Sequence, residues 1–221
     1  MKVVAVILAA GKGSRWGGNI PKQFYIVNGK KMYAHSVEVF NKHPQIDEIV
    51  IVIPKLYKDI VKEDAVKNNW NKIVKIIRGG TERHYSTANA LRALKNESGD
   101  TIVLFHDGAR PYVDSSIIDR VIAALQTANA VTAAIPATDT IAQINDNKIT
   151  NIPDRNFLYH IQTPQGFRID TVRSAYAKAR KDKNLTATDD CGIVLKYLPK
   201  EKVIIVSGSE KNVKCTFNKP I

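Results

Sequence analysis

A loop rich in glycine and positive charge directly follows the first apolar run of the chain. Residues 11–23 read GKGSRWGGNIPKQ, with Arg15 and Lys22 among the glycines. Glycine lets a backbone approach a phosphate closely and turn its N–H groups toward it, while Arg and Lys neutralise phosphate oxygens. The loop therefore predicts a triphosphate cradle, with a flexible turn carrying surface cations as the alternative. Its spacing matches neither the Walker pattern GxxxxGK(S/T) nor the dinucleotide pattern GxGxxG.

A second polar cluster follows a later apolar run. His106, Asp107 and Arg110 come directly after the run TIVLF. Ligands of parallel α/β sheets lie at the carboxyl ends of the strands, so Asp107 and Arg110 are candidates for contact with a polar substrate. An Asp–Arg ion pair that only fixes a loop is the alternative. A lone His is seldom a ligand, so His106 is interpreted as a packing residue.

The elements that must position these side chains alternate in type over most of the chain. Short β-branched runs bounded by Gly, Pro or Asp suit strands buried on both faces of a parallel sheet. The alternation predicts an α/β fold, an open, mostly parallel, Rossmann-like sheet with helices on both faces. The predicted strands are 3–10, 46–54, 73–79, 100–107, 130–137 and 202–208, and the predicted helices are 31–43, 57–69, 86–95, 115–128 and 171–181.

One segment interrupts the alternation. Residues 138–167 contain β-prone stretches around an Asn-Asp-Asn turn, followed by proline-rich connections without helical periodicity. This pattern predicts a β-hairpin arm inserted between the fifth core strand and the following helix. Because no linker divides the chain, we expect a single domain over residues 1–221 that carries this arm.

The composition limits the classes of protein that the chain can belong to. The 221 residues are 44% hydrophobic and carry a formal net charge of +12. This charge suits nucleic acid, an anionic membrane or a phosphorylated small substrate, but the lysines are scattered and not interleaved with aromatic residues. A basic nucleic-acid-binding α/β domain therefore remains the less favoured alternative. Two cysteines without metal-ligand spacing and an N-terminal apolar run too short to span a bilayer predict a cytoplasmic protein without a membrane partner.

Five segments resemble one enzyme family in the same order along the chain. They are LAAGKGSRWGGNIPKQF at 8–24, GGTERHYS at 79–86, HDGARP at 106–111, DRNFLYHIQTPQGF at 154–167 and SGSEKNVKCT at 207–216. This pattern resembles the polyol-phosphate cytidylyltransferases, which act on methylerythritol 4-phosphate or ribitol 5-phosphate. The resemblance implies a nucleotidyltransferase fold and an Mg²⁺-dependent transfer of CMP from CTP to a polyol phosphate, with release of pyrophosphate. Where this sequence reads FNKPI at 217–221, relatives continue with a Pro-Asp turn into a final helix.

The resemblance assigns roles around CTP to matching positions. The implied catalytic cations are Arg15, Lys22 and Lys214, and the implied CTP-binding residues are Leu8, Ala9, Ala10, Gly11, Gly13, Gly80, Thr81 and Ser86. Fixed cations would stabilise the charge that develops on the transferred phosphate and on pyrophosphate. Ser86 is alternatively a helix N-cap, Arg83 a surface or structural ion-pair residue, and Lys214 an edge-strand charge. An ionised acceptor phosphate needs no general base, so the lack of a convincing Ser-His-Asp set is expected.

The resemblance also assigns the acceptor and metal residues. They are Asp107, Arg110, Thr140, Arg155 and Thr163 for the acceptor, with Asp107 near the metal. In relatives the arm reaches across a twofold homodimer, which implies that Arg155 and Thr163 serve the neighbouring subunit's site. A lone hairpin is only marginally stable in water, which independently favours packing of the arm on a partner.

The acceptor is the harder choice, since different segments resemble different branches of the family. HDGARP at 106–111 resembles the methylerythritol group, whereas the stretches at 152–155, 158–159 and 188–193 resemble the ribitol phosphate group. We expect ribitol 5-phosphate or a similar polyol phosphate, with 2-C-methyl-D-erythritol 4-phosphate as the alternative.

Overall fold

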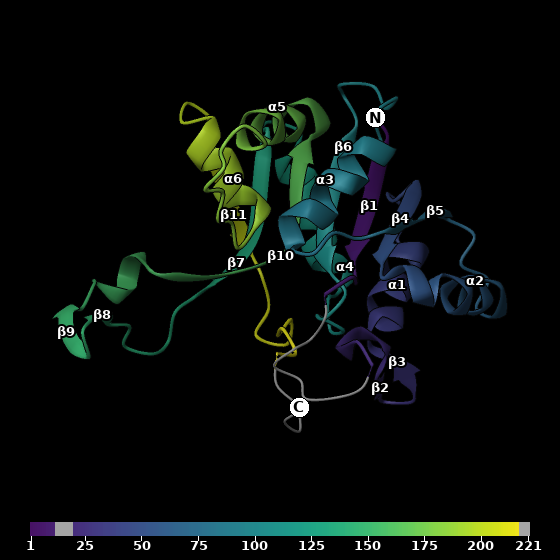
Figure 1. The fold of residues 1–221 in the computed structure, drawn as a ribbon, viewed down its shortest axis with the longest axis horizontal. Helices are drawn as coiled ribbons and strands as arrows, with labels where there is room; N and C mark the ends of the chain where they lie inside the picture. Colours follow the sequence, from purple (N-terminus) through teal and green to yellow (C-terminus); the bar gives the residue numbers. More distant parts are fainter. Residues whose placement is uncertain (12–19, 217–221) are drawn as a thin grey trace.

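The computed structural model describes residues 1–11 and 20–216, and a seven-stranded sheet forms its centre. Each strand of this sheet pairs in parallel with its neighbours except β10, which runs antiparallel to both strands beside it. The order across the sheet (Figure 1) is β11 (Val203–Ser207), β7 (Ala130–Pro136), β10 (Tyr159–Arg168), β6 (Ile102–Asp107), β1 (Val3–Leu8), β4 (Glu48–Ile53) and β5 (Ile73–Arg78).

Helices cover both faces of the sheet, and the central strand β1 is apolar and buried at every position. Ala5 and Ile7 of β1 pack into one core, and Val4 and Val6 pack into the other, as the two-residue period of a strand requires. The first core is covered by α1 (Met32–Lys42), α2 (Lys58–Lys67) and α4 (Ser115–Ala124). The second is covered by α3 (Arg83–Ala93), α5 (Ile169–Ala179) and α6 (Asp190–Tyr197). The predicted fold class is confirmed.

Two elements of this fold were not predicted. Helix α6 was not expected, although Asp189 caps it by accepting a hydrogen bond from the Gly192 N–H at 3.0 Å. Strand β10 was assigned to the inserted arm, and this prediction is wrong because residues 159–168 pair with β7 and β6 in the sheet. Pro164 and Gly166 lower the strand propensity of this segment, and its pairing with β7 is irregular between Ile161 and Gln165.

The inserted arm is therefore shorter than residues 138–167. Its hairpin consists of β8 (Gln143–Asn145) and β9 (Lys148–Asn151), which project away from the body of the protein (Figure 1). Asp146 and Asn147 form the turn with positive φ angles of 48° and 60°, as a two-residue type I′ turn requires. The predicted turn at Asn-Asp-Asn is confirmed.

A second, smaller hairpin lies beside α1. It consists of β2 (Ile26–Val27) and β3 (Lys30–Lys31) and follows a short 3₁₀ helix at Lys22–Phe24. This 3₁₀ helix holds Lys22 near the sheet edge. Within the two described stretches of the chain, no helix has both the length and the apolar character needed to cross a membrane.

Candidate active site

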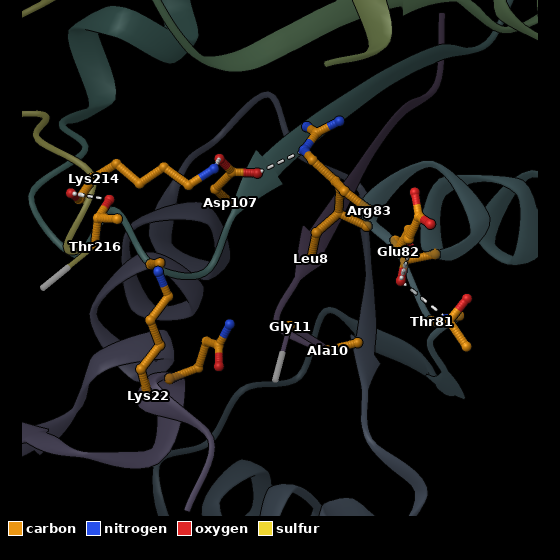
Figure 2. A pocket seen from close by; sticks show the side chains of 14 residues that line it. Leu8, Ala10, Gly11, Lys22, Thr81, Glu82, Arg83, Asp107, Lys214 and Thr216 are labelled. Atoms are coloured by element: carbon orange, nitrogen blue, oxygen red, sulfur yellow. Dashed lines mark hydrogen bonds and ion pairs between the residues drawn. The ribbon is translucent and has the colours of Figure 1, made fainter. Parts of the chain in front are cut away.

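A cleft opens at the carboxyl ends of β1, β5 and β6, where ligands of open α/β sheets bind (Figure 2). It has a volume of about 200 Å³, and a neighbouring cavity of about 230 Å³ shares Arg83, Asp107 and Lys214 with it. The cleft is lined by Leu8, Ala10, Gly11, Lys22, Gln23, Gly80, Thr81, Glu82, Arg83, Ser86, Asp107, Ala109, Lys214 and Thr216.

One wall of the cleft is a close approach of two backbones. A Cβ atom added to Gly79 would lie 2.1 Å from Ala10 Cβ, so only glycine fits there. The Gly80 N–H donates a hydrogen bond to Ser86 Oγ at 3.0 Å, and Ser86 Oγ donates to Glu82 O at 3.2 Å. Ser86 thus fixes the loop from within α3, and its interpretation as an N-cap is wrong because α3 begins at Arg83 with Glu82 at the N-cap.

The predicted CTP-binding residues of the described chain gather at this wall. Leu8, Ala10, Gly11, Gly80, Thr81 and Ser86 line the cleft. Ala9 lies just behind them, fully buried, and its N–H donates to Val52 O. Gly13 and Arg15 lie outside the described residues.

Two lysines from opposite ends of the chain line the same cleft. Lys22 is buried, and its Nζ donates to the backbone oxygen of Cys215 at 2.7 Å. Lys214 Nζ lies 2.7 Å from Asp107 Oδ2, with 39% of its side chain exposed. Figure 2 shows both side chains pointing into the cleft from separate segments. The structure thus brings together the two predicted catalytic cations that it describes.

Asp107 is surrounded by three cations. Arg83 Nε and Lys214 Nζ lie 3.0 and 2.7 Å from its carboxylate oxygens, and Arg110 Nε lies 3.9 Å away. Burial alone would raise the pKa of Asp107, but Arg83, Lys214 and Arg110 outweigh burial and hold the pKa well below its usual range. Asp107 is therefore an ionised oxygen donor at neutral pH.

Arg83 has a structural partner in addition to Asp107. Its Nη1 donates to Asp190 Oδ2 at 2.7 Å, while its Nε donates to Asp107 Oδ1. The interpretation of Arg83 as a structural ion-pair residue is confirmed. Its side chain is only 18% exposed and lines the cleft, so Arg83 is not a surface residue. Sequence reasoning missed Asp190, because only the fold shows which distant carboxylate meets Arg83.

The neighbouring cavity contains two of the predicted acceptor residues, Arg110 and Thr163. Arg110 Nη1 donates to Asn212 O at 2.7 Å, and its buried Nε has no hydrogen-bond partner among the described residues. Thr163 Oγ accepts a hydrogen bond from the Asp107 N–H at 3.1 Å. The prediction that Thr163 serves a neighbouring subunit's site is therefore wrong, because β10 places it beside Asp107 of its own chain.

His106 packs beneath this cavity and does not line it. Complete burial lowers the pKa of His106 to about 4, so the ring is neutral at physiological pH. One ring nitrogen lies 3.1 Å from Thr163 Oγ and the other 3.2 Å from Arg110 O. The interpretation of His106 as a packing residue is consistent with this position.

Thr140 and Arg155 do not reach this chain's cleft. Both lie on the exposed arm, where Arg155 Nη1 donates to Thr138 O at 2.9 Å. Several residues that line the cleft or the neighbouring cavity were not predicted as site residues, since their types carry no distinctive spacing in the sequence. They are Gln23, Glu82, Ala109, Thr216, Gln162, Gln165, Thr188 and Asp189.

The donor set fits an Mg²⁺ ion that arrives with a triphosphate. Among the described residues, no group of three or more His, Cys, Asp or Glu side chains is arranged to hold a metal alone. Mg²⁺ commonly takes one or two carboxylates and completes its coordination with substrate phosphates and water. The ionised Asp107 is such a carboxylate.

An open, mostly parallel α/β sheet with a glycine-walled cleft and converging lysines defines a nucleotidyltransferase. A family model described as IspD, 2-C-methyl-D-erythritol 4-phosphate cytidylyltransferase, matches residues 3–221. The chain belongs to this family of CTP-using cytidylyltransferases, so the predicted family, enzyme class and use of CTP are confirmed.

Similar proteins carry two different names. The bifunctional ribulose 5-phosphate reductase/CDP-ribitol pyrophosphorylase Bcs1 of Haemophilus influenzae is 42% identical over 217 residues, which are 97% of this chain and 46% of that protein. This chain thus spans just under half of that relative. The 2-C-methyl-D-erythritol 4-phosphate cytidylyltransferase of Thermobifida fusca is 38% identical over 97% of this chain and 88% of that protein. The crystal structure of 4-diphosphocytidyl-2C-methyl-D-erythritol synthase from Anaerococcus prevotii matches with a TM-score of 0.85 and 32% identity, covering 98% of this chain and 91% of that one.

Proposed function

We propose that the chain transfers CMP from CTP to 2-C-methyl-D-erythritol 4-phosphate and releases pyrophosphate. The observation that carries the transferase proposal is the convergence of Lys22, Asp107 and Lys214, from three distant segments, on one cleft. The choice of acceptor follows the family model and most of the similar proteins, which name methylerythritol phosphate. The earlier preference for ribitol 5-phosphate has less support.

The cleft suits the attack of one phosphate on another. Lys22 and Lys214, together with Arg15, would bind the triphosphate and stabilise the charge that grows on the α-phosphate and on pyrophosphate. The acceptor phosphate is already ionised near neutral pH, since its second pKa is about 6. Positioning and electrostatics are therefore sufficient, and no side chain has to accept a proton.

Asp107 and its neighbours would form the acceptor side of the site. The ionised Asp107 would accept hydrogen bonds from acceptor hydroxyls and supply an oxygen to Mg²⁺ held mainly by the triphosphate. When bound, Mg²⁺ supplies charge neutralisation on the phosphate oxygens. Arg110 Nε, buried without a hydrogen-bond partner among the described residues, can donate to an acceptor oxygen.

We further propose that the protein is a single-domain, cytoplasmic enzyme and that its arm forms a homodimer. Its side chains Ile144, Ile149 and Phe157 are 59%, 63% and 82% exposed, and exposed apolar groups on a projecting segment favour packing against a partner. In such a dimer, Thr140 and Arg155 would reach the acceptor phosphate at the other subunit's cleft.

Ribitol 5-phosphate is the second candidate acceptor. It is favoured by the 42% identity to the Haemophilus influenzae protein whose name includes CDP-ribitol pyrophosphorylase. Both acceptors present a phosphate and a hydroxylated chain, so the same residues would meet either of them. Discrimination would depend on the side chains that line the cavity next to the cleft.

An Mg²⁺-dependent pyrophosphate-release assay with CTP tests both candidates in parallel. Methylerythritol 4-phosphate should give the highest kcat/KM, with ribitol 5-phosphate and glycerol phosphate as comparison acceptors. A higher kcat/KM with ribitol 5-phosphate would make ribitol 5-phosphate the proposed acceptor in place of methylerythritol 4-phosphate. No pyrophosphate from CTP with any acceptor would contradict the proposed activity.

A further inference from the structure

A chain of buried polar contacts runs from the back of the protein to Asp107. Tyr176 Oη donates to Asp190 Oδ1 at 2.6 Å, and Arg83 Nη1 donates to Asp190 Oδ2 at 2.7 Å. Arg83 Nε then donates to Asp107 Oδ1 at 3.0 Å. The chain joins α5, α6, α3 and the end of β6. Its rear members, Tyr176 and Asp190, do not line the cleft.

Asp190 is a rigid anchor for this chain of contacts. Its side chain is fully buried, and both carboxylate oxygens have a donor. Its backbone N–H donates to Gln165 Oε1 at 3.0 Å, which ties the start of α6 to β10. Side chains held by packing and hydrogen bonds have few alternative positions, so they can fix a neighbour's geometry.

The guanidinium of Arg83 is divided between two carboxylates. Burial alone would lower the pKa of Arg83, but Asp190 and Asp107 raise it, so the charge is permanent. Nη1 contacts Asp190 and Nε contacts Asp107 Oδ1, while the buried Nη2 has no hydrogen-bond partner among the described residues. Asp107 Oδ2 is contacted by Lys214 at 2.7 Å and by Arg110 Nε at 3.9 Å, and Lys214 is more exposed than Arg83.

Asp107 thus has one cation that is held in place, Arg83, and one that can turn away from it, Lys214. Lys214 carries three donor hydrogens on an exposed side chain, so its ammonium group can turn toward a phosphate in the cleft and loosen its contact with Asp107. Without a second fixed cation, the Asp107 carboxylate would be free to rotate once its contact with Lys214 is loosened. Arg83 stays in place because Asp190 holds it from behind.

We infer that Arg83, anchored by Asp190 and Tyr176, is a positioning residue that fixes the Asp107 carboxylate while Lys214 moves to the substrate phosphates. This role rests on the proposed function, which assigns Asp107 to the acceptor. Arg83 acts through Asp107 and needs no contact with the substrate.

A double-mutant cycle tests whether Arg83 acts through Asp107. Arg83→Lys and Asp190→Asn should each lower kcat/KM for the acceptor by about 10- to 100-fold, since misplacement of a reacting group by about 1 Å can cost 100-fold. The KM for CTP should stay within about twofold, because Asp107 faces the acceptor. In an Asp107→Asn background, Arg83→Lys should cost little more, which is the signature of coupled residues. An equal cost in both backgrounds would overturn the inference.

Two further variants separate positioning from folding. Tyr176→Phe keeps the packed ring and removes only the hydroxyl group that donates to Asp190. It should lower kcat/KM for the acceptor less than Asp190→Asn does and leave the KM for CTP unchanged. This variant remains informative even if Asp190→Asn fails to fold. Arg92→Lys is the matched control, because Arg92 lies on the same helix and its Nη1 donates only to Asn89 in the described chain. Wild-type kinetics for Tyr176→Phe would contradict the anchoring role.

The ligand-free structure of Tyr176→Phe provides a readout that does not depend on the reaction. We expect the Arg83 guanidinium to rotate toward Asp107 and the Lys214–Asp107 contact to lengthen. An unchanged Arg83–Asp107 geometry would overturn the inference. If the wild-type protein forms no product with any acceptor, the proposed function fails, while this structural comparison still decides whether Asp190 and Tyr176 position Asp107.

Discussion

A single methyl group added at Gly79 tests the close approach of Gly79 and Ala10 that forms one wall of the cleft. The added Cβ of Gly79→Ala would lie 2.1 Å from Ala10 Cβ and 2.9 Å from Ser86 Oγ. Since carbon atoms in contact are about 3.5–4.0 Å apart, one backbone must move by about 1.5 Å. A shift of about 1 Å at an active site can cost about 100-fold in rate, so we expect a similar loss of kcat/KM for CTP. Overpacking should also lower the free energy of unfolding by about 1–3 kcal/mol.

Pyrophosphate release at varied CTP concentration measures the first effect, and urea unfolding measures the second. The compensating variant is Gly79→Ala combined with Ala10→Gly, which removes the closest clashing atom but leaves the contact with Ser86. It should recover about tenfold of the lost kcat/KM, as expected for residues in direct contact. Wild-type kinetics for Gly79→Ala, or no recovery in the double variant, would refute the close approach of these two backbones as the wall of the slot.

Three further predictions follow from the site and the fold. Lys22→Ala and Lys214→Ala should each lower kcat by about 100-fold or more with a near-wild-type circular dichroism spectrum, because each removes a cation from the developing charge; near-normal pyrophosphate release by both variants would contradict their roles. Burial lowers the pKa of His106 from 6.5 to about 4, so the unfolded state binds more protons than the folded state between pH 6.5 and pH 4. The free energy of unfolding should therefore fall by up to about 3 kcal/mol as the pH is lowered through this range. Urea unfolding at pH 7 and pH 4.5 should show a smaller pH dependence for His106→Gln than for the wild type. Phe157→Asp, at 82% exposure on the arm, should weaken dimerisation in sedimentation velocity without changing the thermal stability of the monomer by more than about 0.5 kcal/mol; an unchanged dimer would remove Phe157 from the interface.

The sheet was predictable from the sequence because its strands are buried on both faces. Val3–Leu8 and Ile102–Asp107 are apolar almost throughout and end in polar or glycine-rich segments, which is the pattern of parallel strands. Asp107 could be placed at the sheet's carboxyl edge for the same reason. Strand β10 could not be identified, because it contains Pro164 and Gly166 and lacks the continuous apolar run of the parallel strands.

The site was predictable only where a residue type and a local motif coincide. Lys22 and Lys214 were named from their motifs, and the fold places both in one cleft. Asp190 was missed because its importance comes from an ion pair with Arg83 across 107 residues of chain, which local spacing does not encode. Tyr176 was missed because its importance comes from its hydrogen bond to Asp190. Thr163 was assigned to the neighbouring subunit's site, whereas β10 places it beside Asp107 of its own chain; that choice depended on where the arm ends and β10 begins.

The structure of this protein with CTP and Mg²⁺ bound would test the assignment of the cleft most directly. We expect the cytosine ring to lie against Ala10 and Gly80, and phosphate oxygens to lie within hydrogen-bonding distance of both Lys22 Nζ and Lys214 Nζ. A nucleotide bound elsewhere, or a triphosphate directed away from both lysines, would contradict this assignment.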